Sequence, residues 1–260
     1  SDLDGDLSVQ IVDGALQPAV FRALGNPGVT CIVDGGAWDG TIWGIIVTEN
    51  GVTYNRYMML LSHGFDEHNV PIYRWGFFDE GDDIWSKAAY KPTCVEDKDP
   101  YANAFVYRYH AYLVEDLHVA ADGTFSEAPS TFFLACRSGA VGKAIHWGYN
   151  PAKWGMELHE LATRVVRADY CGTGVSFTQA GNAVQLHDKL TPQVNEFSKV
   201  TLTDEAAWDL DLSRATCVTL PRDHALRNGF QGIDCGGPDL VPFCTGDDMD
   251  DATIATKVAD

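Results

Sequence analysis

The first half of the chain carries apolar and polar residues in the short alternation that β-strands show. Leu7, Val9 and Ile11 fall on one face of an extended segment, and polar side chains between them fall on the other. We therefore expect a strand over 7–12, close to the amino terminus.

Two longer apolar segments follow, near 41–48 and 52–62, and both are rich in β-branched and aromatic residues. Asn50-Gly51 stands between them, and Asn-Gly is typical of tight hairpin turns. The pattern thus predicts an antiparallel hairpin. The same reasoning predicts a strand at 70–78, one long strand or two short ones within 103–119, and a loop at 120–130.

The apolar period lengthens to that of a helix at about 151–168. Asn150 can cap this helix, and Pro151 suits its first position. One face is apolar, with spacings of four, three and four residues; its members are Trp154, Leu158, Leu161 and Val165. Gly172 and Gly174 can leave the helix with positive φ, and a hairpin turning at 180–182 is expected within 175–188. The fold class is α+β, with mostly antiparallel sheets and at least one amphipathic helix.

Composition limits the classes of function. The chain has 260 residues, of which 45% are hydrophobic, and a net charge of −19. Such an acidic protein repels nucleic acid and anionic membranes, and no apolar run is long enough to cross a bilayer. Three regions are expected, 1–125, 126–225 and 226–260, which can also form one compact domain.

Cysteine usage favours an oxidising compartment. Seven cysteines are scattered along the chain, and none forms the CxxC pair that zinc sites favour. The segment CGGPDLVPFC, from Cys235 to Cys244, is typical of a small disulfide-closed loop, since two glycines and a proline let it turn. An odd number leaves one thiol free or bonded to another chain. The alternative is a cytoplasmic protein with buried free cysteines.

The stretch VVRADYCGTG (165–174) can be a structural joint or an active site. As a joint, Asp169 pairs with Arg164 or Arg167 or accepts backbone N–H groups, while Tyr170 buries its ring and satisfies its hydroxyl at an edge. The catalytic alternative is a thiol nucleophile with a histidine base and an aspartate that orients it. Its candidates are Cys136 or Cys171, then His146, His159 or His187, then Asp169 or Asp188.

The amino-terminal segment DLDGDLSVQIVD (2–13) places oxygen-bearing side chains at the ligand positions of a calcium loop. The carboxylates at these ligand positions are those of Asp2, Asp4, Asp6 and Asp13. Leu7 replaces the glycine of the sharp turn, and Asp13 is shorter than the usual glutamate. The expectation is therefore either no cofactor or Ca²⁺ at this loop. The same segment can instead add as a strand to a neighbouring copy, which in a head-to-tail arrangement gives a filament.

Several motifs together resemble the ADYC domain family. They are CRSGAVGKAIHWGYNP (136–151), ELATRVVRADYCGTGVSFT (160–178), DEAAW (204–208) and ATC (215–217) with Arg222. The resemblance covers about 130–222 and marks Arg167, Asp169, Tyr170 and Gly172 as its structural motif. The family occurs mainly in secreted or lipid-anchored proteins of myxobacteria and related bacteria, and it implies no particular activity.

The resemblance also bears on the disulfides. Relatives carry cysteines where this chain has Ala144 and Ala162. Of the family cysteines that remain, it favours the pairs Cys94–Cys136 and Cys171–Cys217, although four cysteines permit three connectivities.

Two classes of function follow. The first is a secreted or cell-surface structural or binding protein, stabilised by disulfides, whose partners include copies of itself. The alternative is a secreted hydrolase with a Cys/His or Asp/His site. Micrographs of the native material would separate a filament from a free enzyme.

Overall fold

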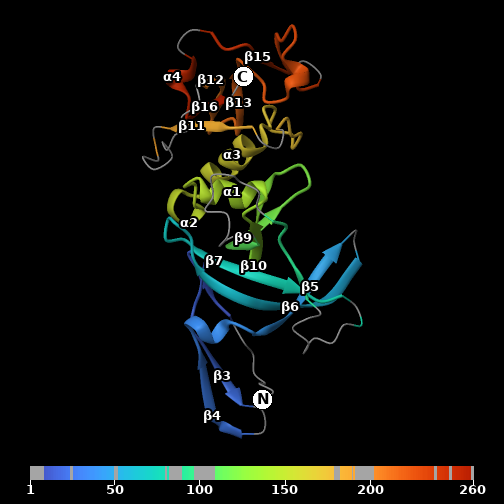
Figure 1. The fold of residues 1–260 in the computed structure, drawn as a ribbon, viewed down its shortest axis with the longest axis vertical. Coiled ribbons are helices and arrows are strands. Elements are labelled where there is room, and N and C mark those ends of the chain that lie inside the picture. Colours follow the sequence, from blue (N-terminus) through green and yellow to red (C-terminus); the bar gives the residue numbers. More distant parts are fainter. Residues whose placement is uncertain are drawn as a thin grey trace. The chain divides into compact units, whose positions relative to one another are not determined.

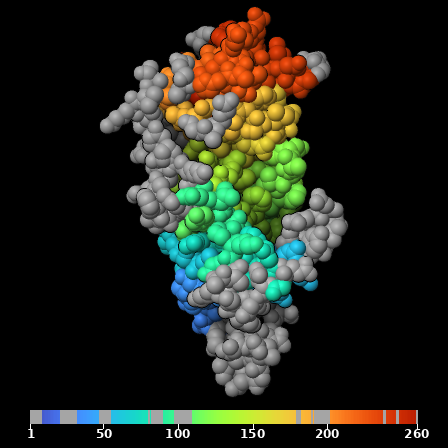
Figure 2. Space-filling model, turned by 45° about the vertical axis from the view of Figure 1, so that its right-hand side comes forward, coloured from blue at the N-terminus to red at the C-terminus, as the bar shows by residue number. Residues whose placement is uncertain are grey.

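The computed structural model describes most of the chain (Figures 1 and 2). The described residues are 9–23, 26–49, 52–79, 81, 90–96, 109–178, 182–188, 190, 202–236, 239–245 and 248–258. The chain forms two compact units, one from 1–116 with 129–138 and the other from 117–128 with 139–260. The three regions expected from the sequence stay a prediction.

Strands build the first unit. They are β1 (Ile11–Val12), β2 (Ala15–Leu16), β3 (Ala19–Ala23), β4 (Asn26–Val33), β5 (Ile42–Glu49), β6 (Val52–Phe65), β7 (Pro71–Phe77) and β8 (Lys91–Pro92), with a short 3-10 turn η1 (Gly35–Trp38). The largest sheet described has the order β10-β9-β7-β6-β5, with β8 beside β7. Strands β9 (His110–Val119) and β10 (Phe125–Cys136) run through both units.

The predicted hairpin is present as β5 and β6. Its register runs without interruption from Ile42 opposite Met59 to Glu49 opposite Val52. The turn dipeptide Asn50-Gly51 lies outside the described residues. Apolar residues of the first unit gather on one face of the sheet, where Trp43 packs edge-on against Trp75.

The amino-terminal segment forms a small hairpin of its own. Asp13 and Gly14 both have positive φ, 53° and 77°, between β1 and β2, as a two-residue turn in a hairpin requires. Val9, Ile11 and Leu16 pack against the core of their own unit. Tyr73 accepts a hydrogen bond from the Leu16 amide at 2.8 Å, so this hairpin is tied to the sheet.

The second unit combines helices with a four-stranded antiparallel sheet of order β11-β16-β12-β13. Its helical segments are α1 (Ala140–His146), α2 (Pro151–Trp154), α3 (Met156–Arg167), η2 (His224–Leu226) and α4 (Asp248–Asp251). Its strands are β11 (Val184–Asp188), β12 (Thr203–Asp209), β13 (Arg214–Val218), β14 (Gly232–Asp234), β15 (Leu240–Pro242) and β16 (Ile254–Val258). The α+β, largely antiparallel fold class is therefore confirmed.

The single helix predicted over 151–168 is wrong in one respect. Asn150 and Pro151 begin a helix as expected, and the Asn150 side chain accepts the Ala152 amide. Gly155 then takes φ 85°, outside the helical region, and divides the segment into α2 and α3. Helix α1 was not predicted.

Two loop assignments also need correction. The loop expected over 120–130 is limited to a tight turn, because β10 begins at Phe125. The hairpin expected over 175–188 is absent from its described part: residues 175–178 are not strand, and β11 pairs with β16 instead. The strand expected over 103–119 is described from His110 onward.

Helix α3 buries its apolar face in the core of the second unit. Leu161 and Val165 are fully buried there, together with Trp208 of β12 and Ile254 of β16. The ring of Tyr170 stacks on Trp208 with centroids 5.5 Å apart. None of the described helices has the length and apolar character needed to span a bilayer.

Candidate functional site

Three disulfides lie within the units, one in the first and two in the second. They join Cys94 to Cys136, Cys171 to Cys235, and Cys217 to Cys244. The first is the pairing that the family resemblance favoured. The other expected pairs, Cys171–Cys217 and Cys235–Cys244, are wrong. The physical reason is the β14–β15 hairpin: Cys235 follows its first strand and Cys244 its second, so each bonds to a different neighbour.

The motif ADYC (168–171) stands at the exit of α3. Ala168 adopts the left-handed conformation with φ 52° and caps the helix, and its amide donates to the Val165 carbonyl at 3.1 Å. Gly172 and Gly174 have φ of 69° and 83°, so the chain turns sharply twice after the motif. Gly174 has no room for a side chain, because a Cβ there would overlap the carbonyl of Asp122.

Asp169 holds this turn together. Its carboxylate accepts from Arg164 at 2.9 Å and from the backbone amides of Thr173 at 3.0 Å and Gly174 at 2.8 Å. Both arrangements expected for this carboxylate are thus present at once. A second carboxylate, that of Glu160, lies 2.7 Å from Arg164. Asp169 is only 1% exposed, and its hydrogen bonds to described residues all serve the turn after α3.

Tyr170 enters a buried polar network. Its hydroxyl donates to Glu205 Oε1 at 2.8 Å and accepts from the Arg222 amide at 2.9 Å. Nε of Arg222 lies 2.7 Å from the same Glu205 oxygen, and its Nη1 donates to the Val166 carbonyl at 3.0 Å. Burial and the adjacent carboxylate raise the pKa of the Tyr170 hydroxyl well above its ordinary value.

We call Tyr170, Glu205 and Arg222 the ADYC network. All three are fully buried, yet 35 and 52 residues of sequence separate Tyr170 from its two partners. They come from ADYC, from DEAAW and from the Arg222 motif. Motifs that the sequence presents separately therefore meet in one place. The signal for Glu205 was a charge beside the apolar run Ala206–Trp208.

Arg167 ties the segment after the motif to the helix end. Its guanidinium donates to the Gly174 carbonyl, and its own carbonyl accepts from Ser176 Oγ at 2.9 Å and from the Phe177 amide at 3.2 Å. The side chain thus fastens the segment after the motif to the last turn of α3. This is a structural use of the motif arginine.

The thiol-nucleophile alternative lacks its thiols, because Cys136 and Cys171 are both bonded to other cysteines. The candidate base His159 is buried on α3 with Nδ1 2.8 Å from the Tyr149 carbonyl. Burial lowers its pKa to about 4. Asp188 accepts from the Tyr149 hydroxyl at 2.7 Å. These side chains are committed to packing and to hydrogen bonds within the second unit.

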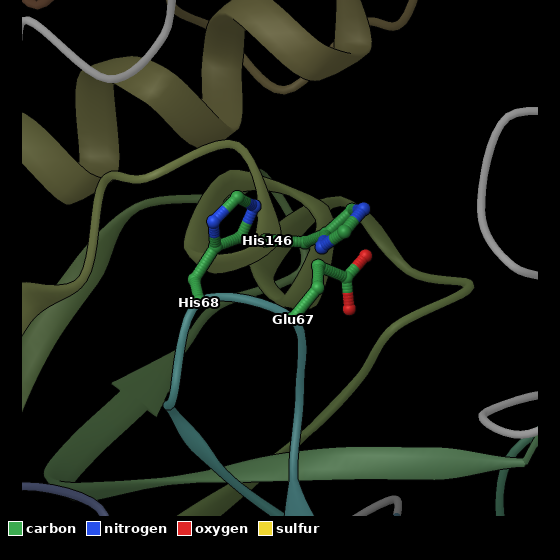
Figure 3. Close-up of side chains that lie close together, drawn as sticks. All are labelled: Glu67, His68 and His146. Atoms are coloured by element: carbon green, nitrogen blue, oxygen red, sulfur yellow. The ribbon is translucent and has the colours of Figure 1, made fainter.

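Other histidines lie at the surface. His187 is exposed on β11. In the first unit, Nδ1 of His63 lies 2.8 Å from Asp39, a pair that the sequence did not suggest because 24 residues separate its members. Figure 3 shows Glu67 and His68 on the turn between β6 and β7, and it also labels His146, the last residue of α1. His146 belongs to the second unit.

A buried polar group also anchors the β6–β7 turn. Asp66 accepts from the Tyr112 hydroxyl at 2.7 Å and from the amides of His68 and Val70 at 2.9 and 2.8 Å. Burial, followed by the charge of Asp66, raises the pKa of Tyr112, while Arg137 opposes the rise. This group stabilises a turn.

The expected calcium loop falls mostly outside the described residues, which exclude Asp2, Asp4 and Asp6. Asp13 is described, and it forms the exposed turn between β1 and β2. The calcium site stays a prediction.

Comparison with known proteins covers the ADYC motif and the residues of the ADYC network. A family model described as the ADYC domain matches residues 48–224. Searches of curated proteins and of solved structures found no match. The matched region starts well before residue 130, where the resemblance was expected to begin, and it includes all three members of the ADYC network. Since the match covers more than half of the sequence, the chain belongs to the ADYC domain family.

Proposed function

We propose that this chain is a disulfide-stabilised structural or binding protein that works outside the cell or at its surface. The observation that carries the proposal is the set of three disulfides, two of which lie in the unit that holds the ADYC motif. Disulfides persist in oxidising surroundings and are rare in the reducing cytosol.

The stabilisation that these disulfides provide supports an extracellular location. Cys171 and Cys235 are 64 residues apart and Cys94 and Cys136 are 42 apart. In the chain-entropy model each such link stabilises the fold by about 4 kcal/mol. A domain is stable by only about 5–15 kcal/mol in total, so a reducing compartment would remove much of the margin.

The same bonding favours a structural role for the family motif. Cys171 is a disulfide partner, Asp169 is saturated with donors, and Tyr170 is buried in an ion-paired network. A site that acts on a substrate needs at least one accessible reactive group, and these residues offer none.

Self-association belongs to this proposal. Strand donation by the amino terminus is its less supported form, because Val9, Ile11 and Leu16 already pack on their own core. To donate 7–16 to a neighbour and build a filament, the chain would have to withdraw these side chains.

A secreted hydrolase is the second candidate, in its Asp/His form. One observation favours it: the partly exposed pair of His63 and Asp39, in which a carboxylate can orient an imidazole. Purified protein that hydrolyses a panel of ester, peptide and glycoside substrates, with activity lost in His63→Gln, would support this candidate.

Cell fractionation tests the leading proposal. In the native host we expect the protein in the medium or at the surface, accessible to a membrane-impermeant biotin reagent, with six cysteines oxidised. Cytosolic protein whose thiols all react with an alkylating reagent before reduction would contradict the proposal.

A further inference from the structure

Strand β5 is the last strand of the largest sheet described. The strand order ends with β6-β5, and no strand in the described part of the chain pairs with the second side of β5 (Figure 1). An edge of this kind presents a row of backbone donors and acceptors to any strand that approaches it.

Hydrogen bonds on either side of the hairpin show which residues face this edge. The Leu60 amide donates to the Thr41 carbonyl at 3.0 Å, so residue 41 faces β6. The Phe78 amide donates to the Tyr57 carbonyl at 3.3 Å. The backbone groups of residue 57, which lies opposite Gly44, therefore face β7 and point away from β5. Bonding alternates along an antiparallel pair. The backbone groups of Ile42, Gly44, Ile46 and Thr48 therefore point out of the sheet.

The edge lacks the features that usually protect such strands. Natural edges carry lysine, proline or a bulge. The sequence IWGIIVTE has neither residue, and its eight pairs with β6 are regular. Ile46 is 75% exposed. Next to it, Gly44 leaves space beside the ring of Tyr57, whose Cε1 lies 3.8 Å from where a Cβ would stand.

We propose that β5 pairs antiparallel with β5 of a second copy of this chain, about a two-fold axis at Ile45. The inference rests on the proposed structural role and names its partner. A continuous sheet needs directly opposed residues to share a face, which the axis at Ile45 satisfies. Gly44 then lies opposite Ile46 of the second copy, and about eight backbone hydrogen bonds join the outward-facing groups of the two strands.

The charge distribution along β5 permits a second copy at this edge. The chain carries a net charge of −19, which opposes association in general. Within β5 the only charged residue is Glu49, at one end. The two-fold axis places the two Glu49 residues at opposite ends of the paired strands, and it places Glu49 opposite Thr41. The contact is thus neutral at its centre, and added salt strengthens it by screening the remaining charge.

Sedimentation equilibrium tests the surface with matched variants. The chain mass is 28.4 kDa, and we expect a reversible species of twice that mass in 0.15 M salt. Ile46→Lys should raise its dissociation constant at least tenfold, because the lysine meets the neighbouring strand on the contact face. Ile32→Lys is the control, since Ile32 is 65% exposed on β4, away from β5; its dissociation constant should stay within about twofold.

Amide hydrogen exchange gives a readout that needs no variant. As protein concentration rises, the amides of Ile42, Gly44 and Ile46 should become protected, while Trp43 and Ile45 are protected throughout by β6. Three results would overturn the pairing: a monomer at every concentration, association unchanged in Ile46→Lys, or open-ended polymers in place of a dimer. Extracellular location is measured separately, so the dimer can fail while the proposed function stands.

Discussion

Glu205→Gln is the substitution that probes the ADYC network most sharply. It keeps the shape of the side chain and removes its charge. The Arg222 guanidinium is fully buried, and Glu205 is its ion-pair partner in the described structure. A buried ion that loses its counter-charge costs about 3–5 kcal/mol. Because glutamine can still accept from Tyr170, most of the loss should come from the charge of Arg222.

Urea denaturation of the oxidised protein measures this loss. Trp208, stacked on Tyr170, is one of the tryptophans of the second unit whose fluorescence changes when this unit unfolds. Two units can unfold in separate steps, so the transition is fitted for this unit. Glu127→Gln makes the same chemical change at an exposed position of β10 and should stay within about 0.5 kcal/mol of the parent. A loss below about 1 kcal/mol for Glu205→Gln would refute the reasoning.

A double-mutant cycle separates the ion pair from its surroundings. Glu205→Leu and Arg222→Met each leave one buried charge alone, whereas the double variant leaves none. The double variant should therefore cost at least about 2 kcal/mol less than the sum of the single ones. Additive costs would mean that the two side chains do not act as a pair.

Three further outcomes follow from the described residues and the sequence. The pKa of His159 is about 4 in the folded protein and about 6.5 in the unfolded chain, so between these values the unfolded chain binds the extra proton. The stability that neutral His159 contributes is complete above pH 6.5 and falls by about 3 kcal/mol towards pH 4. Urea unfolding of His159→Gln across this range should lack that dependence on pH. Gly174→Ala should destabilise by several kcal/mol because a Cβ meets backbone, while Gly229→Ala, also at positive φ but in open space, should cost about 1 kcal/mol by the same denaturation assay. Calorimetric titration should show Ca²⁺ binding that Asp4→Asn with Asp6→Asn abolishes, and an absence of binding heat would remove the amino-terminal calcium loop.

Local pattern was sufficient for the elements that depend on local sequence. The β5–β6 hairpin followed from alternation and a turn dipeptide, and the start of α2 followed from Asn150 and Pro151. The break between α2 and α3 at Gly155 did not follow from the sequence, because many helices tolerate a glycine within an apolar helical period. The positive φ of Gly155 in the structure shows the division. Asp13-Gly14 carried a hairpin signal that the calcium pattern obscured.

The sequence pattern could not predict hydrogen-bond and disulfide partners that lie far apart along the chain. Asp169 bonds to residues within five positions, so its role could be anticipated. Tyr170 was expected to satisfy its hydroxyl, but its partners Glu205 and Arg222 approach only when β12 and the segment after β13 pack on α3. Two of the three expected disulfides were wrong for the same reason, while Cys94–Cys136 was right. Sequence spacing suggested that Cys235 closes a local loop, whereas the hairpin places it beside Cys171.

We hold that Cys171, the cysteine of the ADYC motif, is a disulfide partner with a structural role and no chemical one. Proteolytic digestion of the unreduced protein, after alkylation of free thiols in denaturant, followed by mass spectrometry of the linked peptides, tests it most directly. We predict one peptide pair joined through Cys171 and Cys235 and a single alkylated cysteine per chain. An alkylated Cys171, or a link from it to Cys217, would contradict the claim.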